Sequence, residues 1–195
     1  MTTASKKFLE SFNYSLKKID TNKIEKLISK IKALKKRKGR IFFLGVGGSA
    51  GNTSHAVNDF RKLCNIECYA PTDNVSELTA RTNDEGFNTI FVEYLEISKL
   101  SKNDAIFIFS VGGGNKKKKV STNLIEAIVL AKKRGANIFS IVGRQDGYSY
   151  KHSDISILVK VNNKKLLTPI SEAMQPTIWH LIVSDKRLQS QKTKW

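Results

Sequence analysis

Short apolar runs alternate with helix-length amphipathic stretches over most of the chain. The apolar runs are rich in Ile, Phe and Val and lie at residues 41–45, 105–110, 137–142 and 155–160. Helical patterns follow the first three runs, at about 49–63, 121–134 and from 143 onward. Short buried strands that alternate with helices are typical of a parallel sheet covered on both faces. The pattern therefore predicts an α/β core over residues 40–195.

Two further helical patterns precede this core. Apolar residues recur at steps of three and four through residues 5–36, with a break near Asp20-Thr21. We expect a helical hairpin there, with an apolar stripe that needs a partner. A last long pattern, Ile170 to Leu188, predicts a C-terminal helix. With 195 residues in total, the chain fits a single domain, 1–195, with the hairpin as its N-terminal part.

The formal net charge of +17 is unusual for a chain of this length. A polyanionic partner is its most direct interpretation, because Lys and Arg neutralise phosphates. Only 7 of the 34 basic residues are Arg, however, and Lys is scattered through every segment. Recognition of nucleic acid usually depends on the arginine fork. We therefore predict a basic surface that attracts small phosphorylated substrates, and not a nucleic-acid-binding protein.

The chain lacks the marks of export or membrane insertion. Its apolar runs are far shorter than the roughly 18 residues that a membrane span needs, and no apolar stretch follows the N-terminal residues as in a signal peptide. Two cysteines, Cys64 and Cys68, are too few for a disulfide framework or a structural zinc site. These features predict a reduced, cytoplasmic protein with no membrane partner.

Glycine-rich segments follow two of the predicted strands. The first contains Gly47, Gly48 and Ser49, and the second runs from Ser110 to Asn115. Ligands of open parallel sheets bind at the carboxyl ends of strands, where glycines allow close approach and helix N-termini offer N–H groups to anions. Neither segment matches a P-loop or a dinucleotide fingerprint. Two such turns together favour a phosphate or sugar site.

Two histidines and two carboxylates are candidates for chemistry. His55 and Asp59 are one helical turn apart after the first glycine segment, and Glu172 and His180 lie on broadly the same side of the last helix. Such a set can form a divalent metal site or a general acid–base pair. Simple burial of His180, which follows Trp179, is the competing interpretation.

The order and spacing of these motifs resemble the phosphoheptose isomerases, small members of the sugar-isomerase (SIS) domain superfamily. The resemblance rests on Gly47-Gly48-Ser49-Ala50, His55, the segment 83–87, the loop that opens at Ser110, and the late pair that ends at His180. It covers nearly the whole chain. It implies a SIS-type three-layer sandwich, with a five-stranded parallel sheet flanked by helices. It also implies a homotetramer whose N-terminal helices pack between subunits.

The resemblance also implies the residues that bind substrate. They are Gly47, Gly48, Ser49, Asn83, Asp84, Ser110, Gly112, Gly113, Gly114 and Ser121. Ser49 and the loop at Ser110 would hold the phosphate, and Asn83 and Asp84 would lie near the sugar. Glycines replace some family hydroxyls here, and their N–H groups can take over that role. The inserted Lys116–Lys119 is either a lid that steers phosphate or a solvated loop.

Four residues match the group that binds zinc in some family members and transfers the proton. These are His55, Asp59, Glu172 and His180. Asp59 stands for a glutamate and Glu172 for a glutamine, while Val46 and Pro169 replace polar residues of the family. The survival of both histidines and both carboxylates indicates a divergent branch with an intact site and a divalent metal, with zinc as the expected ion.

The implied activity is an aldose–ketose isomerisation. Sedoheptulose 7-phosphate would become D-glycero-D-manno-heptose 7-phosphate, a precursor of heptose-containing surface polysaccharide. Asp59 or Glu172 would take the proton to give an enediolate, and His180 would act as the acid. The alternative is a non-catalytic SIS protein, either a scaffold that binds the replication initiator or a phosphosugar sensor.

Overall fold

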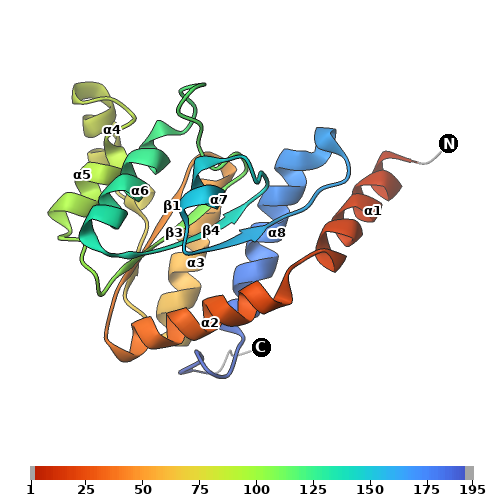
Figure 1. Cartoon of the computed structure of the whole chain (residues 1–195), viewed down its shortest axis with the longest axis horizontal. Helices are drawn as coiled ribbons and strands as arrows, with labels where there is room; N and C mark the ends of the chain where they lie inside the picture. The colour runs from red at the N-terminus through yellow and green to blue at the C-terminus, as the bar shows by residue number, and fades with distance from the viewer. Residues whose placement is uncertain (1–2, 192–195) are drawn as a thin grey trace.

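The computed structural model describes residues 3–191, which contain one five-stranded sheet. All pairings are parallel, in the order β2-β1-β3-β4-β5. Figure 1 labels the three central strands, β1, β3 and β4. The strands are β1 (Ile41–Gly45), β2 (Cys68–Tyr69), β3 (Ala105–Ser110), β4 (Asn137–Val142) and β5 (Ile155–Leu158). The predicted α/β class and the five-stranded parallel sheet are confirmed.

Eight α-helices and two short 3₁₀ turns complete the described part of the chain. The helices are α1 (Ala4–Lys17), α2 (Thr21–Lys36), α3 (Gly48–Cys64), α4 (Val75–Asp84), α5 (Ile90–Ile97), α6 (Thr122–Arg134), α7 (Tyr148–His152) and α8 (Leu167–Val183). The 3₁₀ turns are η1 (Pro71–Asp73) and η2 (Lys164–Leu166). Among residues 3–191, no helix is both long enough and apolar enough to cross a membrane.

Helices cover both faces of the sheet, so side chains on both faces of each central strand are buried. In β1, Ile41 and Phe43 pack with α2, α3 and α8, whereas Phe42 and Leu44 pack with α5 and α6. This alternation follows from the two-residue period of a strand. It explains why the strand runs are continuously apolar, since neither face meets water.

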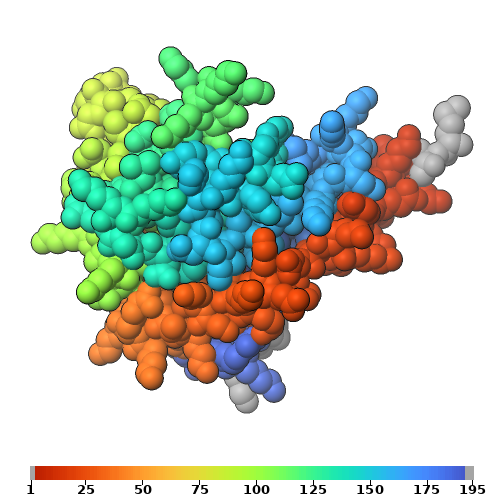
Figure 2. Space-filling model, in the orientation of Figure 1, coloured from red at the N-terminus to blue at the C-terminus, as the bar shows by residue number. Residues whose placement is uncertain are grey.

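The N-terminal helices form an open pair and not a closed hairpin. The break expected near Asp20-Thr21 is real, because the Asp20 side chain caps α2 by accepting the Lys23 N–H. The two helices diverge from that point: α2 packs against β5 and α1 against α8. Figure 2 shows α1 extending from the body beside the start of α8. The apolar stripe of α2 is thus satisfied within the chain, whereas Leu9 and Leu16 of α1 stay exposed.

Two predicted helix boundaries were wrong. The stretch from residue 143 forms a loop and then only the five residues of α7, because the N–H groups of Tyr148 and Ser149 are held by the carbonyls of Gly114 and Gly113. The last helix ends at Val183, before the expected Leu188. A turn there buries Leu188 completely. The sequence patterns also missed β2, α4 and α5.

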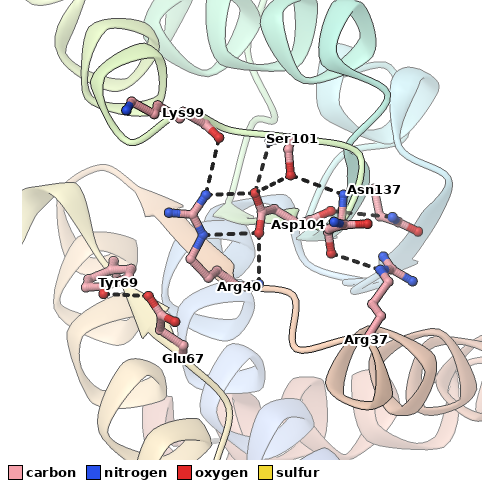
Figure 3. A network of polar contacts seen from close by, with 9 residues as sticks. Arg37, Arg40, Glu67, Tyr69, Lys99, Ser101, Asp104 and Asn137 are labelled. Atoms are coloured by element: carbon pink, nitrogen blue, oxygen red, sulfur yellow. Dashed lines mark hydrogen bonds and ion pairs between the residues drawn. The ribbon is translucent and has the colours of Figure 1, made fainter.

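A polar network connects the amino ends of β1 and β3 (Figure 3). Asp104 accepts hydrogen bonds from the Arg40 guanidinium at 2.9 and 3.2 Å, from the Arg40 backbone N–H at 3.0 Å and from Ser101 at 3.0 Å. Burial alone would raise the pKa of Asp104, but these bonds outweigh it and lower the pKa. Asp104 is therefore held as a carboxylate that ties two strands together.

Candidate active site

The strand order makes the carboxyl ends of β1 and β3 a topological switch point. These strands are neighbours in the sheet, yet the chain leaves β1 for α3 on one face and leaves β3 for α6 on the other. Such a switch point, at the carboxyl ends of the strands, is where open parallel sheets bind ligands. Both predicted glycine loops open here, at Gly47 and at Ser110.

The first loop requires glycine at two positions. Gly47 has a φ of 64°, which side chains disfavour. A Cβ on Gly48 would lie 2.6 Å from Oε2 of Glu172, so the missing side chain lets this carboxylate approach the start of α3. The free N–H groups and the dipole of a helix N-terminus favour a negative charge there.

Ser49, in the first turn of α3, belongs to a buried hydrogen-bond chain. The fully buried Gln175 of α8 donates from Nε2 to Ser49 Oγ at 3.0 Å. Asn52 donates to Gln175 Oε1 at 2.7 Å and to the backbone carbonyl of Glu172 at 3.0 Å. The sequence analysis missed Asn52 and Gln175. Their positions in the sequence could have indicated them. Asn52 lies three residues after Ser49 and Gln175 three residues after Glu172, so each lies on the same helix face as a predicted site residue.

The helices α3 and α8 pack side by side and run in the same direction. Asn52 contacts Glu172, and twelve residues further along α3 the Cys64 thiol lies 3.9 Å from the carbonyl oxygen of Val183. Between these contacts, parallel packing brings residues 55 and 59 of α3 against residues 179 and 180 of α8. The local fold therefore assembles the predicted histidines and Asp59 from segments about 120 residues apart.

Asp59 is the centre of this cluster. Its Oδ2 lies 3.2 Å from Nε2 of His180 and 3.5 Å from Nε2 of His55, and it accepts the Trp179 indole N–H at 3.1 Å. Asn58 donates to Oδ1 at 3.0 Å. The Asp59 side chain is 12% exposed, whereas the side chains of His55 and His180 are 56% and 50% exposed. A buried carboxylate thus holds two imidazoles at the surface of the helix pair, and His180 is not the buried core residue of the competing interpretation.

The cluster fits a divalent metal ion. One ligand atom from each of His55, Asp59 and His180 lies within 4.8 Å of the others. Ligands at about 2.0–2.1 Å around a tetrahedral zinc ion are about 3.3–3.4 Å apart, close to the 3.2 and 3.5 Å that separate Asp59 from the histidines. Two imidazoles and a carboxylate are also a donor set that zinc accepts with one position left open.

Glu172 does not join the three-residue cluster. Its carboxylate lies against Gly48 at the first turn of α3, seven residues before His55. At 1.5 Å per residue this is a displacement of about 10 Å along the helix. The expected four-residue metal set is therefore, within this chain, a cluster of three plus a separate carboxylate at the helix start.

The second glycine loop is folded tightly on itself. Ser110 Oγ accepts the Gly113 N–H at 3.0 Å, and Gly113 and Gly114 have φ values of 69° and 82°. The carbonyl of Gly113 accepts both the N–H and the hydroxyl of Ser149. Ser121, at the start of α6, has a φ of 47° and makes no side-chain cap. Gly112 to Ser121 are thus at the carboxyl edge, where the sequence placed a phosphate site.

Asn83 and Asp84 lie apart from these loops. They end α4, face solvent, and hydrogen-bond to each other at 2.7 Å. Helix α4 packs against α5 and η1. Within this chain the structure does not bring the two residues to the α3–α8 cluster.

Comparison with known proteins identifies the family of this chain. The family model of the SIS domain matches residues 7–143. The phosphoheptose isomerase of Sulfurimonas denitrificans is 30% identical over 166 residues, which span 83% of this chain and 80% of that protein. The chain belongs to the phosphoheptose isomerase family of SIS-domain proteins. Its place in this family makes it an isomerase, as the sequence predicted.

Two other similarities mark the breadth of the family. The lincomycin biosynthesis protein LmbN of Streptomyces lincolnensis is 31% identical over 150 residues. The matched segment covers 74% of this chain and 54% of that protein. The structure of phosphoheptose isomerase GmhA from Neisseria gonorrhoeae superposes with a TM-score of 0.67 at 22% identity, covering 93% of this chain and 98% of that one. The second similarity supports the fold alone.

Proposed function

We propose that this protein is a phosphosugar isomerase that converts sedoheptulose 7-phosphate to D-glycero-D-manno-heptose 7-phosphate. The observation that carries the proposal is the cluster of His55, Asp59 and His180 in a member of this family. Two exposed imidazoles on one buried carboxylate form an acid–base centre of the kind that aldose–ketose isomerisation requires.

Asp59 and His180 are the proposed proton-transfer pair. The carboxylate takes the proton from the carbon beside the carbonyl, and the resulting cis-enediolate receives it back on the neighbouring carbon. His180 donates a proton to the developing oxyanion and recovers it later. The 3.2 Å between Oδ2 and Nε2 lets the two groups serve adjacent atoms of one substrate. Glu172 lies eight residues before His180 on α8, about 12 Å along the helix, and is too far from it to share that task.

Asp59 is oriented by fixed donors. The Trp179 indole N–H and the Asn58 amide fix its two oxygens at 3.1 and 3.0 Å, so the shorter side chain is held in one position. Glu172 and the start of α3 would instead contact hydroxyl groups of the sugar. This assignment gives each of the two carboxylates a different role.

The substrate phosphate is proposed to bind between Ser49 and Ser110, at the carboxyl ends of β1 and β3. The N–H groups of Gly112 to Gly114 and the hydroxyl of Ser121 would add donors. Two buried polar atoms beside these strand ends have no partner within residues 3–191: Asn123 Nδ2 in α6, and Ser171 Oγ in α8, which packs on Gly143. Unsatisfied buried groups are costly, and a bound ligand is one way to satisfy them.

Zinc, held by His55, Asp59 and His180, is the proposed alternative to His180 as the group that stabilises the oxyanion, because a histidine nitrogen that binds a metal has no proton to donate. When bound, it would supply Lewis-acid stabilisation of negative charge on a substrate oxygen. The homotetramer is proposed too, supported by Leu9 and Leu16 exposed on α1. The cytoplasmic location and the link to surface polysaccharide stay predictions from the sequence.

The test is proton NMR of sedoheptulose 7-phosphate incubated with the purified protein, with and without added zinc. We expect a new heptose anomeric signal from the wild type and none from His180→Ala. His152→Ala is the matched control, because His152 lies on α7 outside the cluster. If the wild type produces no signal under either metal condition, this substrate is wrong. Retained binding of sedoheptulose 7-phosphate without turnover would then favour a sensor.

A further inference from the structure

Strand β5 forms one edge of the sheet and has a strand neighbour on one side only. It pairs with β4, from Phe139 opposite Ile155 to Val142 opposite Leu158. Among residues 3–191, no strand pairs with its other side. The backbone N–H and C=O groups of such an open edge are a template on which a further extended chain can pair.

A groove follows this edge and continues around the amino ends of β4 and β5. It consists of three adjoining hollows of about 540, 500 and 280 Å³, and Asp154 and Ile155 line all three. Helix α2 forms one wall, and Tyr150 of α7 belongs to the other. Figure 2 shows α2, in orange and red, beside the surface of α7 and β5, in cyan to blue. This elongated shape suits an extended chain better than a compact ligand.

Four lysines line the groove: Lys23, Lys26 and Lys30 from α2, and Lys132 from α6. Lys23 reaches the strand edge, where its ammonium donates to the carbonyl of Ser156 at 3.2 Å. This carbonyl of β5 is therefore open to a donor from outside the sheet. Within residues 3–191 the ammonium groups of Lys26 and Lys30 make neither an ion pair nor a hydrogen bond.

The acidic residues of the groove already have partners. The Glu25 carboxylate pairs with the Arg187 guanidinium at 2.8 Å. Oδ2 of Asp154 accepts the N–H of Ile138 at 2.8 Å, which ties the residue before β5 to the start of β4. Four lysines thus share the groove with two carboxylates that are engaged elsewhere. An anionic partner would meet excess positive charge along the whole groove.

We propose that this groove is a docking site for an extended acidic segment of another protein, which adds a strand to the open edge of β5. Ile155 and Ile157 pack on the face of the sheet that α2 covers. Side chains of a strand alternate between the two faces, so every second side chain of the added strand lies on the α2 face, beside Lys26 and Lys30. A segment with Asp or Glu at alternate positions fits this arrangement, with main-chain hydrogen bonds for affinity and the lysines for selection.

The charge of the chain favours a different protein as the occupant. A second copy would bring its own formal net charge of +17 to a basic groove. The C-terminal residues 184–195 contain four basic residues and one acidic residue, so they do not match the groove either. A nucleic acid offers negative charge, but it lacks the peptide N–H and C=O groups with which a strand edge pairs.

The groove and the candidate active site lie at opposite ends of the sheet. Residues 135–138 and 154 line the groove at the amino ends of β4 and β5, whereas both glycine loops open at carboxyl ends. A docked segment therefore leaves the active site open. The inference is independent of the proposed function, and either can fail without the other.

Fluorescence anisotropy of a labelled octapeptide of alternating Glu and Thr, titrated with the whole protein at constant ionic strength, tests the site. We expect Lys26→Glu and Lys30→Glu each to weaken binding at least about fivefold, because each replaces an attraction by a repulsion. Lys36→Glu is the matched control, since Lys36 is exposed on the same helix but does not line the groove. Equal losses in Lys30→Glu and Lys36→Glu, or no binding by the wild type, would overturn the proposal.

Two methylated peptides test the added strand itself. Alternate N–H groups of a strand point to the same edge, so N-methylation at the Glu positions or at the Thr positions blocks one edge each and keeps every charge. We expect one methylated peptide to bind nearly as the parent does and the other to bind at least about tenfold more weakly. Equal affinity of the two would overturn strand addition.

Two further measurements separate the other occupants. A single-stranded oligonucleotide that binds with the same dependence on Lys26 and Lys30, while the peptide does not bind, would assign the groove to nucleic acid. Sedimentation of the wild type and of Lys30→Glu tests for a second copy. An oligomer that this charge reversal dissociates would show that the groove is an interface between copies of the chain. Either result would contradict the proposal.

Discussion

Asp59 and Asp104 are the buried carboxylates of residues 3–191, and they lie in contrasting regions. Asp104 sits at the amino ends of the strands, where Arg40 and Ser101 supply all its hydrogen bonds. Asp59 sits between α3 and α8, where two of its neighbours are exposed imidazoles. Both regions bury one negative charge, but only the second connects that charge to solvent through exposed side chains, the imidazoles of His55 and His180.

The difference separates stability from chemistry. A carboxylate whose donors are arginine and backbone N–H groups is fixed in one protonation state and holds elements together. A carboxylate that lies beside two exposed imidazoles shares these proton-binding neighbours with any substrate that reaches them. In open parallel sheets ligands bind at the carboxyl ends of the strands. Polar residues at the amino ends, such as Arg40 and Asp104, can therefore hold neighbouring strands together.

The largest expected effect is that of Asp59→Asn. The amide keeps the shape and an oxygen for the Trp179 N–H, but it removes the base and the negative charge between the histidines. We expect kcat to fall by about 10³-fold, within the 10²–10⁴ range of acid–base catalysis. We expect the melting temperature to change by only a few degrees. Steady-state kinetics and thermal melts followed by circular dichroism measure the two quantities.

If Asp59→Asn stays active while Glu172→Ala does not, the proton-transfer pair has been assigned to the wrong carboxylate. If Asp59→Asn fails to fold, the contrast between the two aspartates is lost. His180→Gln then separates the effects, because His180 is exposed and its replacement leaves the core intact.

The next largest effect is expected for the matched change in the Arg40–Asp104–Ser101 network, Asp104→Asn. It removes the charge that faces Arg40 at 2.9 Å. Hydrogen bonds to charged groups are worth about 1.5–3 kcal/mol, and we expect the free energy of unfolding to fall by about 2–3 kcal/mol. Activity per folded molecule should stay within about twofold. Urea unfolding measures the first, and kinetics well below the transition measures the second. A loss of kcat without a loss of stability would contradict the assignment of Asp104 to stability and Asp59 to catalysis.

The pH dependence of stability sharpens the same contrast. The folded-state pKa of Asp104 lies below its unfolded value, because its hydrogen bonds outweigh the effect of burial. Its contribution is therefore present above the unfolded pKa of about 3.9 and is lost as the pH falls through the folded value. We expect wild type and Asp104→Asn to differ most in unfolding free energy near pH 6, and the difference to shrink as the pH falls below the unfolded pKa of about 3.9. Urea melts across this range measure it, and a constant difference would count against Asp104.

The sequence predicted those features of the fold and the site that depend on residues close together along the chain. Apolar runs identified four strands, and the i, i+4 spacing of His55 and Asp59 placed them on one face of α3. Cys68–Tyr69 was missed because a two-residue strand has too few side chains to show a period. Gln175 was missed because only the packing of α8 on α3 turns its amide toward Ser49. The distance between Glu172 and His55 also depends on that packing. The family motifs alone had therefore placed Glu172 in the same metal set as His55.

The smallest expected effect is that of Glu172→Gln. Glutamine stands at this position in the family that the motifs resemble, and it keeps the length and one oxygen of the side chain. The Glu172 carboxylate lies against Gly48, where the start of α3 favours a negative charge. We expect kcat to fall less than tenfold and KM to carry most of the change, as for a group that binds substrate without transferring the proton.

A split between kcat and KM distinguishes this role from that of the base. Were Glu172 the base, its amide would lose kcat as fully as Asp59→Asn does, with KM unchanged. Gly48→Ala gives an independent measurement, because its new methyl group must displace the Glu172 carboxylate while both catalytic groups stay in place. The two variants should then raise KM to a similar extent. A carboxylate at the carboxyl edge of the sheet would thus serve binding, and chemistry would rest on the one that is buried between the histidines.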